Sequence, residues 1–326
     1  HVWIRGKTGH VAVTMLPKPD LLPDVLPTER LTANGMPVPF VRAELRRIPN
    51  LANVWTVVAL WASTVGIIGG AIWISHPVAW VVAFLLMGPQ FARFASLSHE
   101  AAHRLLFSNK RLNDFVGRWI VGYSTFTSTD LYRRGHMAHH KDEFGPNEPD
   151  MNLYNGYPIT RASMRRKLTR DLDGNSGWKN FKSLLRGLRY EASRGHAVRI
   201  LASQAVILAL FTLAGWPQLY LLLWFAPWMT TWRVINRLRA IAEHGGMRRS
   251  DDRRLTTHLV RQSRLAGFVM VPYNIGYHLA HHVDMGVPWR RLPALHRELV
   301  AAGWATDALE YPSYRALWRK LSSRPG

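Results

Sequence analysis

The sequence predicts an all-α integral membrane protein with four transmembrane helices in two hairpins and a cytoplasmic helical cap that carries histidine clusters. Three observations predict this fold. Residues 48–92 and residues 200–232 contain no Asp, Glu, Lys or Arg. A short uncharged turn divides each of these apolar runs, and basic residues flank both. Three histidine clusters lie outside the runs, in polar segments.

The N-terminal segment, residues 1–47, is polar and interrupted by several prolines. This composition predicts an extended cytoplasmic arm that leads to a short surface helix. We expect no signal peptide between Val2 and Leu16, because Arg5 and Lys7 interrupt that stretch.

The first hairpin is predicted over residues 48–98. Residues 54–74 are long enough, at about 1.5 Å per residue, to cross a hydrocarbon core of about 30 Å. Residues 75–77, Ser-His-Pro, form the turn, and residues 78–96 form the return crossing. Because basic residues lie at both ends of the hairpin, the positive-inside rule places these ends in the cytoplasm and the turn outside. We therefore expect His76 to lie away from any metal site.

The second hairpin is predicted over residues 199–235. Residues 200–215 cross outward, residues 216–217 form a Trp-Pro turn, and residues 218–235 return. These crossings are short, and tilt or interfacial tryptophans would accommodate them. The alternative, a buried helical hairpin in a soluble protein, is weaker, because core packing requires neither basic flanks nor uncharged turns.

The polar segments, residues 99–198 and residues 236–326, are expected to form the cytoplasmic cap, with both termini on that side. In a bacterium the membrane would be the cytoplasmic one. The formal net charge of +21 would suit nucleic acid in a soluble protein, but no nucleic-acid-binding motif accompanies it. Beside apolar spans, basic residues bind anionic membrane lipids and suit an acidic electron donor.

The absence of cysteine limits the chemistry of any metal site. It excludes disulfides, thiolate zinc sites and iron–sulfur clusters held by this sequence. Any metal must therefore have histidine and oxygen ligands.

Histidine spacing predicts such a site. His99 and His103 are four residues apart, so on a helix both rings point the same way. The pattern His-x-x-His-His occurs twice, and a further histidine precedes a Gly-Gly pair that would end the fourth helix. The nine predicted ligands are His99, His103, His136, His139, His140, His244, His278, His281 and His282. No catalytic side chain is predicted beyond these ligands.

Nine imidazoles exceed the roughly four ligands of one zinc ion, so two metal ions are predicted. Nitrogen-rich coordination without thiolate suits iron, with copper and zinc as weaker candidates. Ring nitrogens that face away from the metals need acceptors. The candidate acceptors, each equally suited to an ordinary salt bridge, are Glu100, Asp142, Glu143, Glu148, Asp150, Glu243 and Asp284.

The motifs together resemble those of the membrane fatty acid desaturase superfamily, which includes related hydroxylases and carotenoid-modifying enzymes. The resemblance covers roughly residues 48–300 in order, spacing and topology. Its motifs are specific as a set and weak singly. They are His99-Glu-Ala-Ala-His103, His136-Met-Ala-His139-His140 and His278-Leu-Ala-His281-His282.

This resemblance implies a non-haem di-iron centre at the cytoplasmic membrane surface, with dioxygen as co-substrate and the nine histidines as ligands. Some acyl-CoA desaturases have an asparagine four residues before the histidine that His244 matches, but here the residue is Ala240. Asn274, four residues before His278, is the candidate replacement, with a turn or helix cap as the alternative. We expect no fused cytochrome b5 domain, so a separate ferredoxin, rubredoxin or cytochrome b5-like donor is implied.

Three functions are compatible with these features. The first is a desaturase that acts on an acyl chain of a lipid or an acyl thioester. The second is a hydroxylase or ketolase of a lipid, a carotenoid or another amphipathic molecule on the same scaffold. The third is a non-catalytic metal-binding or metal-transport membrane protein, which would need polar residues within the spans and is therefore disfavoured.

The remaining histidines are isolated, and a lone histidine is more often a surface or capping group than a ligand. These residues are His1, His10, His196, His258 and His296. His296 is expected to lie on a docking helix in the basic C-terminal region.

Overall fold

The computed structural model describes residues 14–325 as a mostly helical protein. The predicted N-terminal arm therefore lies only partly within the described residues. His1, His10 and most of the segment from Val2 to Leu16 lie outside them. The arm ends in the short helix α1, as its composition predicted.

The N-terminal half of the chain contains the following elements: η1 (Pro19–Leu21), α1 (Pro39–Leu45), α2 (Asn50–Ile74), α3 (Pro77–Ala102), α4 (Lys110–Phe115), the π-helix η2 (Val116–Gly122), η3 (Tyr123–Thr125), α5 (Thr129–Lys141), α6 (Met151–Tyr154) and α7 (Arg161–Leu172). The C-terminal half contains α8 (Asn175–Gly187), α9 (Glu191–Leu213), α10 (Pro217–Tyr220), the π-helix η4 (Leu221–Phe225), α11 (Ala226–Met229), α12 (Thr231–His244), η5 (Arg253–Leu255), β1 (Leu259–Val260), α13 (Arg264–Val269), α14 (His278–Val283), α15 (Leu292–Ala301), β2 (Glu310–Tyr311) and α16 (Tyr314–Leu321).

The first hairpin consists of α2 and α3. Ser75 ends α2 in the left-handed conformation, with φ of 49°. The His76 side chain then accepts a hydrogen bond from the backbone N–H of Val78, and Pro77 begins α3 at the first-turn position that suits proline. α3 continues past the predicted end of the crossing, so it extends into the body of the molecule.

The fourth predicted crossing is not one regular helix. The segment divides into α10, η4 and α11, and the backbone breaks at Thr230, with φ of −124° and ψ of −86°, before α12. Pro227 has no backbone N–H to donate within a helix, which is one reason that this stretch departs from α geometry. Residues 110–125 are similarly divided into α4, η2 and η3.

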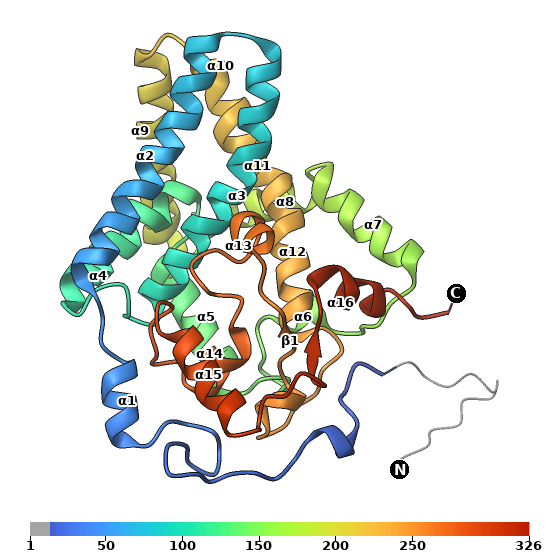
Figure 1. Cartoon of the computed structure of the whole chain (residues 1–326). Helices are drawn as coiled ribbons and strands as arrows, with labels where there is room; N and C mark the ends of the chain where they lie inside the picture. The colour runs from blue at the N-terminus through green and yellow to red at the C-terminus, as the bar shows by residue number, and fades with distance from the viewer. Residues whose placement is uncertain (1–13, 326) are drawn as a thin grey trace.

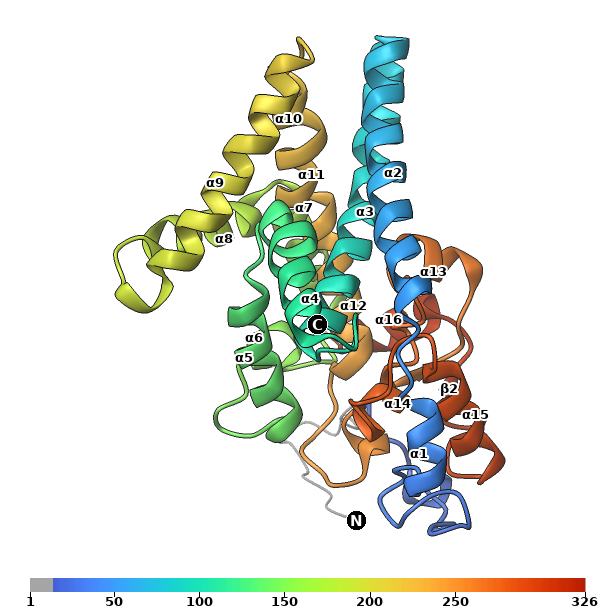
Figure 2. The ribbon, with the colours of Figure 1, turned by 90° about the vertical axis from the view of Figure 1, so that its left-hand side faces the viewer.

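Within residues 14–325, three helices are long and apolar enough to cross a membrane: those within Pro39–Ile74, Pro77–Ala102 and Glu191–Leu213. Only 17%, 44% and 22% of their most apolar windows are buried in the protein, so most of this apolar surface faces outward. Such surface needs a lipid or protein partner. Figures 1 and 2 show that the α2–α3 and α9–α10 pairs project from the same end of the molecule.

The core is organised around α3, which packs against α2, η2, α5, α11 and α12. Trp224 is fully buried and lies against Trp61, Phe91 and Phe94, with ring centroids 5.4 Å apart for Phe91 and 6.2 Å for Phe94. Through this aromatic cluster, η4 packs against both helices of the first hairpin. The position of the histidines at the end of α3 is thereby fixed relative to the second hairpin.

The polar body of the protein contains α5, α6 and the C-terminal elements from α13 to α16 (Figure 1). The departures from the all-α prediction within residues 14–325 are the short parallel pairing of β1 with β2 and a single antiparallel bridge between Leu31 and Pro37.

Candidate metal centre

Four helices deliver the nine predicted histidines. His99 lies in the last turn of α3, and His103 is its C-cap residue. α5 carries the second cluster, α12 ends at His244, and α14 begins at His278. Every one of the nine except His103 is buried.

The histidines form two adjoining groups. In the first group, one ring nitrogen from each of five residues lies within 4.8 Å of the others: His99, His103, His136, His140 and His281. In the second group, His139, His244 and His282 satisfy the same criterion. His278 joins the second group, since its Nε2 lies 3.1 Å from His244 Nε2 and 3.0 Å from His282 Nε2.

The short Nε2–Nε2 distances have the value expected for ligands of one metal. Two nitrogens bound at about 2.1 Å and at right angles to each other lie about 3 Å apart. In the first group, His140 Nε2 lies 3.1 Å from His136 Nε2 and 3.0 Å from His281 Nε2. The two groups adjoin where the rings of His140 and His282 have centroids 4.4 Å apart.

Hydrogen bonds on the far side of the rings define where the lone pairs point. His244 Nδ1 donates to the Thr256 carbonyl oxygen at 2.9 Å, and His282 Nδ1 donates to Glu143. Since a carbonyl or carboxylate oxygen accepts, the Nε2 atoms of these two histidines carry lone pairs. Both lone pairs face His278 Nε2, which can donate only one proton, so a cation between the three atoms would satisfy them all.

The first group contains buried ring nitrogens with no hydrogen-bond partner in the described part of the chain. They are both nitrogens of His99 and Nε2 of His103. A buried polar atom without a partner is costly. The donor set of both groups therefore fits metal ions better than it fits a metal-free core.

The environment favours neutral imidazoles, which is the form that binds metal. Burial, followed by the charges of neighbouring imidazoles, lowers the pKa of His140, His281 and His282. His139 differs, because burial lowers its pKa but the hydrogen bond to Glu148 and the charge of Glu148 outweigh this effect and raise it.

Three of the candidate carboxylates contact or approach the rings of the second group. The Glu148 carboxylate accepts from His139 Nδ1 at 2.9 Å and also from the backbone N–H of Asp150. Glu143 accepts from His282 Nδ1, and Glu243 Oε1 lies 3.5 Å from His278 Nδ1. The hydrogen bonds from Glu148 and Glu143 orient the rings of His139 and His282 from behind, whereas His278 Nδ1 makes no hydrogen bond within the described residues.

The other candidates have different surroundings. Asp150 groups with His139 and Glu148, whereas Glu100 accepts from the backbone N–H of Trp289 at 3.0 Å. The remaining three make no side-chain hydrogen bond to a ligand ring within residues 14–325. Asp142 pairs with Arg249, Asp284 pairs with Arg46, and Asn274 occupies a turn with φ of 61°.

Sequence reasoning missed three contacts to the histidines. The Thr256 carbonyl leaves no sequence signal, because any residue can supply it. Tyr154, whose hydroxyl lies 3.3 Å from His139 Nδ1, is also unmarked by any motif. The rings of Tyr132 and His136 are stacked, with their centroids 5.1 Å apart. Tyr132 lies four residues before His136 on the same helix, and this spacing could have indicated the contact.

A cavity of about 280 Å³ reaches both groups. His136, His139, His244 and His278 form part of its wall. Its other lining is mixed. The polar part comes mainly from α12, with Arg233, Asn236, Arg239 and Glu243, and the apolar part includes Ala95, Leu153, Trp232 and Ala240. The cavity could therefore admit a substrate with a polar group to the histidines.

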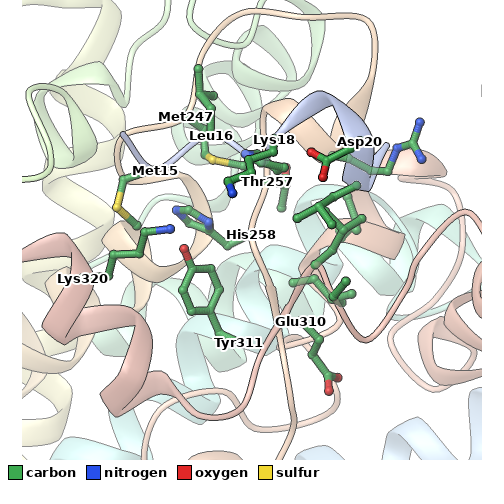
Figure 3. Close-up of a pocket in the computed structure, with 17 residues that line it drawn as sticks. Met15, Leu16, Lys18, Asp20, Met247, Thr257, His258, Glu310, Tyr311 and Lys320 are labelled. Carbon is green, nitrogen blue, oxygen red and sulfur yellow. The ribbon is translucent and has the colours of Figure 1, made fainter. Parts of the chain in front are cut away.

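A separate cavity of about 340 Å³ lies between the N-terminal arm and the C-terminal region. Figure 3 shows His258, Tyr311 and Lys320 on its wall, and none of the nine histidines lines it. His258 is buried and donates from Nε2 to the Gly245 carbonyl oxygen at 2.8 Å. Of the two roles expected for an isolated histidine, surface or capping group, His258 therefore does not have the surface role: it is buried and bonds the C-cap residue of α12.

The other isolated histidines lie away from the metal groups. His76 caps α3 at the opposite end of that helix. His196 Nδ1 is hydrogen-bonded to the Ser128 hydroxyl at 2.9 Å. His296 lies on α15, and its ring centroid is 5.1 Å from that of Tyr277.

Comparison with known proteins gives a family match and two relatives that are named as desaturases. Residues 75–315 match the family model described as Fatty acid desaturase. The chain is 25% identical to a dihydrorhizobitoxine desaturase of Bradyrhizobium elkanii, over 64% of this chain and 64% of that protein. It is 23% identical to an sn-1 oleoyl-lipid 12-desaturase of Arthrospira platensis, over 84% of this chain and 82% of that protein. The chain thus spans less than two thirds of the first relative.

Proposed function

Because the chain belongs to the fatty acid desaturase family, we propose that it is a membrane di-iron oxidoreductase that desaturates an acyl chain of a lipid. It would use dioxygen and electrons from an external donor. The observation that carries this proposal is the meeting of nine histidines in two adjoining groups, with neighbouring Nε2 atoms only 3.0–3.1 Å apart within each group. A structural role for so many buried imidazoles would leave several of them without partners.

Two iron ions fit the two groups. The first would be held by the five histidines grouped around His99, and the second by His139, His244, His278 and His282. All-nitrogen coordination without thiolate suits iron. Bound iron supplies the dioxygen activation that breaks an unactivated C–H bond, which no side chain can supply.

The protein residues position and isolate this chemistry. Glu148 and Glu143 hold the rings of His139 and His282 in one orientation through hydrogen bonds to Nδ1. Burial of the rings excludes bulk water from the reacting position. The cavity along α12 leads a substrate to the histidines of both groups.

The proposed topology has four crossings. The segment from α10 to α11 would complete the second hairpin despite its irregular helix, with tryptophans at the membrane interface. The predicted segments then become a cytoplasmic arm (1–47), hairpin 1 (48–98), a cytoplasmic insertion (99–198), hairpin 2 (199–235) and a cytoplasmic C-terminal region (236–326). Basic residues beside both hairpins support this orientation.

The substrate and the donor are proposed from the same features. The two relatives are named as desaturases of different compounds, so their names support the reaction more than the substrate. The mixed polar and apolar lining of the cavity favours, as a second candidate, an amphipathic small molecule that is desaturated or hydroxylated. The positive charge of the chain suits an acidic donor, such as a ferredoxin, a rubredoxin or a cytochrome b5-like protein.

Lipid profiling tests the proposal. Cells that lack the gene should lose one class of unsaturated acyl chain and accumulate its saturated precursor, and the wild-type gene should restore it. The His281→Ala variant should reach the membrane but fail to restore the product. An unchanged lipid profile would remove the acyl-chain assignment, and accumulation of a hydroxylated product would assign the alternative outcome.

A further inference from the structure

Arg233 is a partly buried cation that forms no salt bridge within residues 14–325; the nearest charge acting on it, Asp171, is paired with Arg237. The two other arginines of α12 both have carboxylate partners: Arg237 pairs with Asp171, and Arg239 pairs with Glu243 at 2.7 Å. For Arg233, residues 14–325 provide no carboxylate oxygen within 4.0 Å. An enclosed charge is costly unless an opposite charge or several hydrogen bonds compensate it.

The contacts of Arg233 fix its guanidinium and leave most of its donors free. Nε donates to the Trp228 carbonyl oxygen at 3.0 Å, and the guanidinium carbon lies 4.3 Å from the centre of the Trp228 ring. A guanidinium has five N–H donors, and the Nη groups carry four of them. A planar pair of Nη groups matches the two oxygens of a carboxylate or phosphate.

Arg233 lies in the wall between two cavities. Four of the nine histidines line the inner cavity, of about 280 Å³, and an outer cavity of about 570 Å³ lies beside α8 and the start of α9. Thr127, Tyr132, Trp232 and Arg233 line both cavities. From Arg233 to His244, α12 rises about 16 Å at about 1.5 Å per residue, and this length of helix borders the inner cavity.

We propose that Arg233 binds an oxyanion, a carboxylate or phosphate, at the polar end of the substrate, and that the rest of the substrate extends along α12 to the histidines. This inference rests on the proposed function and adds a substrate class to it. The distance between Arg233 and the histidines would then select which carbons react. Asn236, on the same wall of the inner cavity, provides a further polar contact along the path.

A membrane phospholipid could supply the same oxyanion. The outer cavity lies against α8, which exposes Trp178 and Leu185, so a lipid head group could approach it. The substrate remains the proposed source, because Arg233 also lines the cavity that contains the histidines. An experiment must therefore separate a substrate carboxylate from a retained phospholipid.

Binding of radiolabelled decanoate to the full chain in phosphatidylcholine nanodiscs tests the proposal, with decanol as the neutral probe. The wild type should bind decanoate about tenfold or more tightly than decanol, because a charge-assisted contact is lost with the alcohol. Arg233→Gln should abolish this preference, and Arg233→Lys should restore part of it. Arg237→Gln, on the same helix but paired with Asp171, is the matched control and should keep the preference.

Equal affinity of the wild type for decanoate and decanol would overturn the proposal, even if Arg233→Gln does not fold. So would an unchanged decanoate preference in a folded Arg233→Gln variant. Native mass spectrometry separates the sources: a phospholipid retained by the wild type but not by Arg233→Gln, with no decanoate preference, would assign the oxyanion to the membrane. Because binding needs neither electrons nor dioxygen, absence of desaturation with the preference intact would contradict only the proposed function.

Discussion

The hydrogen bonds behind the imidazoles differ between the two groups. In the second group, His139 and His282 donate to Glu148 and Glu143, whereas both nitrogens of His99 in the first group have no partner among the described residues. A carboxylate behind an imidazole fixes the ring and increases its basicity as a ligand. The second group should therefore hold its metal more tightly than the first group does.

Replacement of Glu148 by glutamine tests this role. Glu148→Gln should lower the metal affinity by about 10–100-fold, because the neutral amide is a weaker acceptor for His139 Nδ1. The measurement is the iron retained per chain after a timed challenge with a chelator. Glu298→Gln, which alters a surface pair with Arg30, is the control and should retain as much iron as the wild type. Equal retention by both variants would contradict a role for Glu148 at the site.

Sequence spacing indicates which histidines can meet but not which acceptor orients each of them. Asp142 and Glu143 are neighbours, yet Glu143 contacts His282 while Asp142 pairs with Arg249. The path of the backbone after α5 decides which of the two points inward, and composition does not specify that path. The Thr256 carbonyl was unpredictable for the same reason.

At the scale of elements, the end of α3 depends on a close approach to the π-helix η2. A Cβ atom added at Gly117 would lie 2.7 Å from the Cβ of Ala101, which stands between His99 and His103. No side chain fits this contact without displacing one of the two helices. The glycine therefore allows η2 to hold the first histidine pair in place.

Gly117→Ala should destabilise the protein by about 1–3 kcal/mol, since it overpacks the contact with α3. It should also reduce bound iron, because the displaced helix carries His99 and His103. Thermal unfolding and iron content measure the two effects. The matched control is Gly66→Ala on α2, where an added Cβ would meet nothing within 4 Å. If both alanine variants behave alike, the close approach has no such role.

The sequence predicted some elements better than others. The turn of the first hairpin was predictable because Ser75, His76 and Pro77 combine a helix end, a cap and a first-turn proline. The irregular fourth segment was not, because Pro227 indicates a disturbance but not where the helix resumes. α12 ends at His244, directly before the Gly-Gly pair that predicted this end.

At the scale of the whole molecule, each His-His pair contributes to both groups. Neighbouring residues on an α-helix point about 100° apart. Accordingly, His140 and His281 lie in the first group, while their neighbours His139 and His282 lie in the second. From the two hairpins in the sequence we expected the histidine clusters to meet on one side of the membrane. The match to the family model confirms the predicted family. The division into groups depends on how α5 and α14 pack, which the sequence motifs do not encode.

Removal of metal should destabilise the whole fold, because the lone pairs of His244 and His282 would then face His278 without a cation between them. Treatment with an iron chelator under reducing conditions should lower the Tm by several degrees, and added ferrous iron should restore it. Calorimetry or a thermal-shift assay measures this change. A Tm that is the same with and without the chelator, in samples shown to have lost iron, would contradict metal-supported folding.

We propose that the nine histidines hold two irons side by side. Mössbauer spectroscopy of protein enriched in ⁵⁷Fe, with iron counted per chain in the same sample, tests it most directly. We expect about two irons per chain in nitrogen-rich environments, magnetically coupled in the oxidised protein. Stoichiometric zinc without dioxygen-dependent turnover, or two isolated irons without coupling, would contradict the claim.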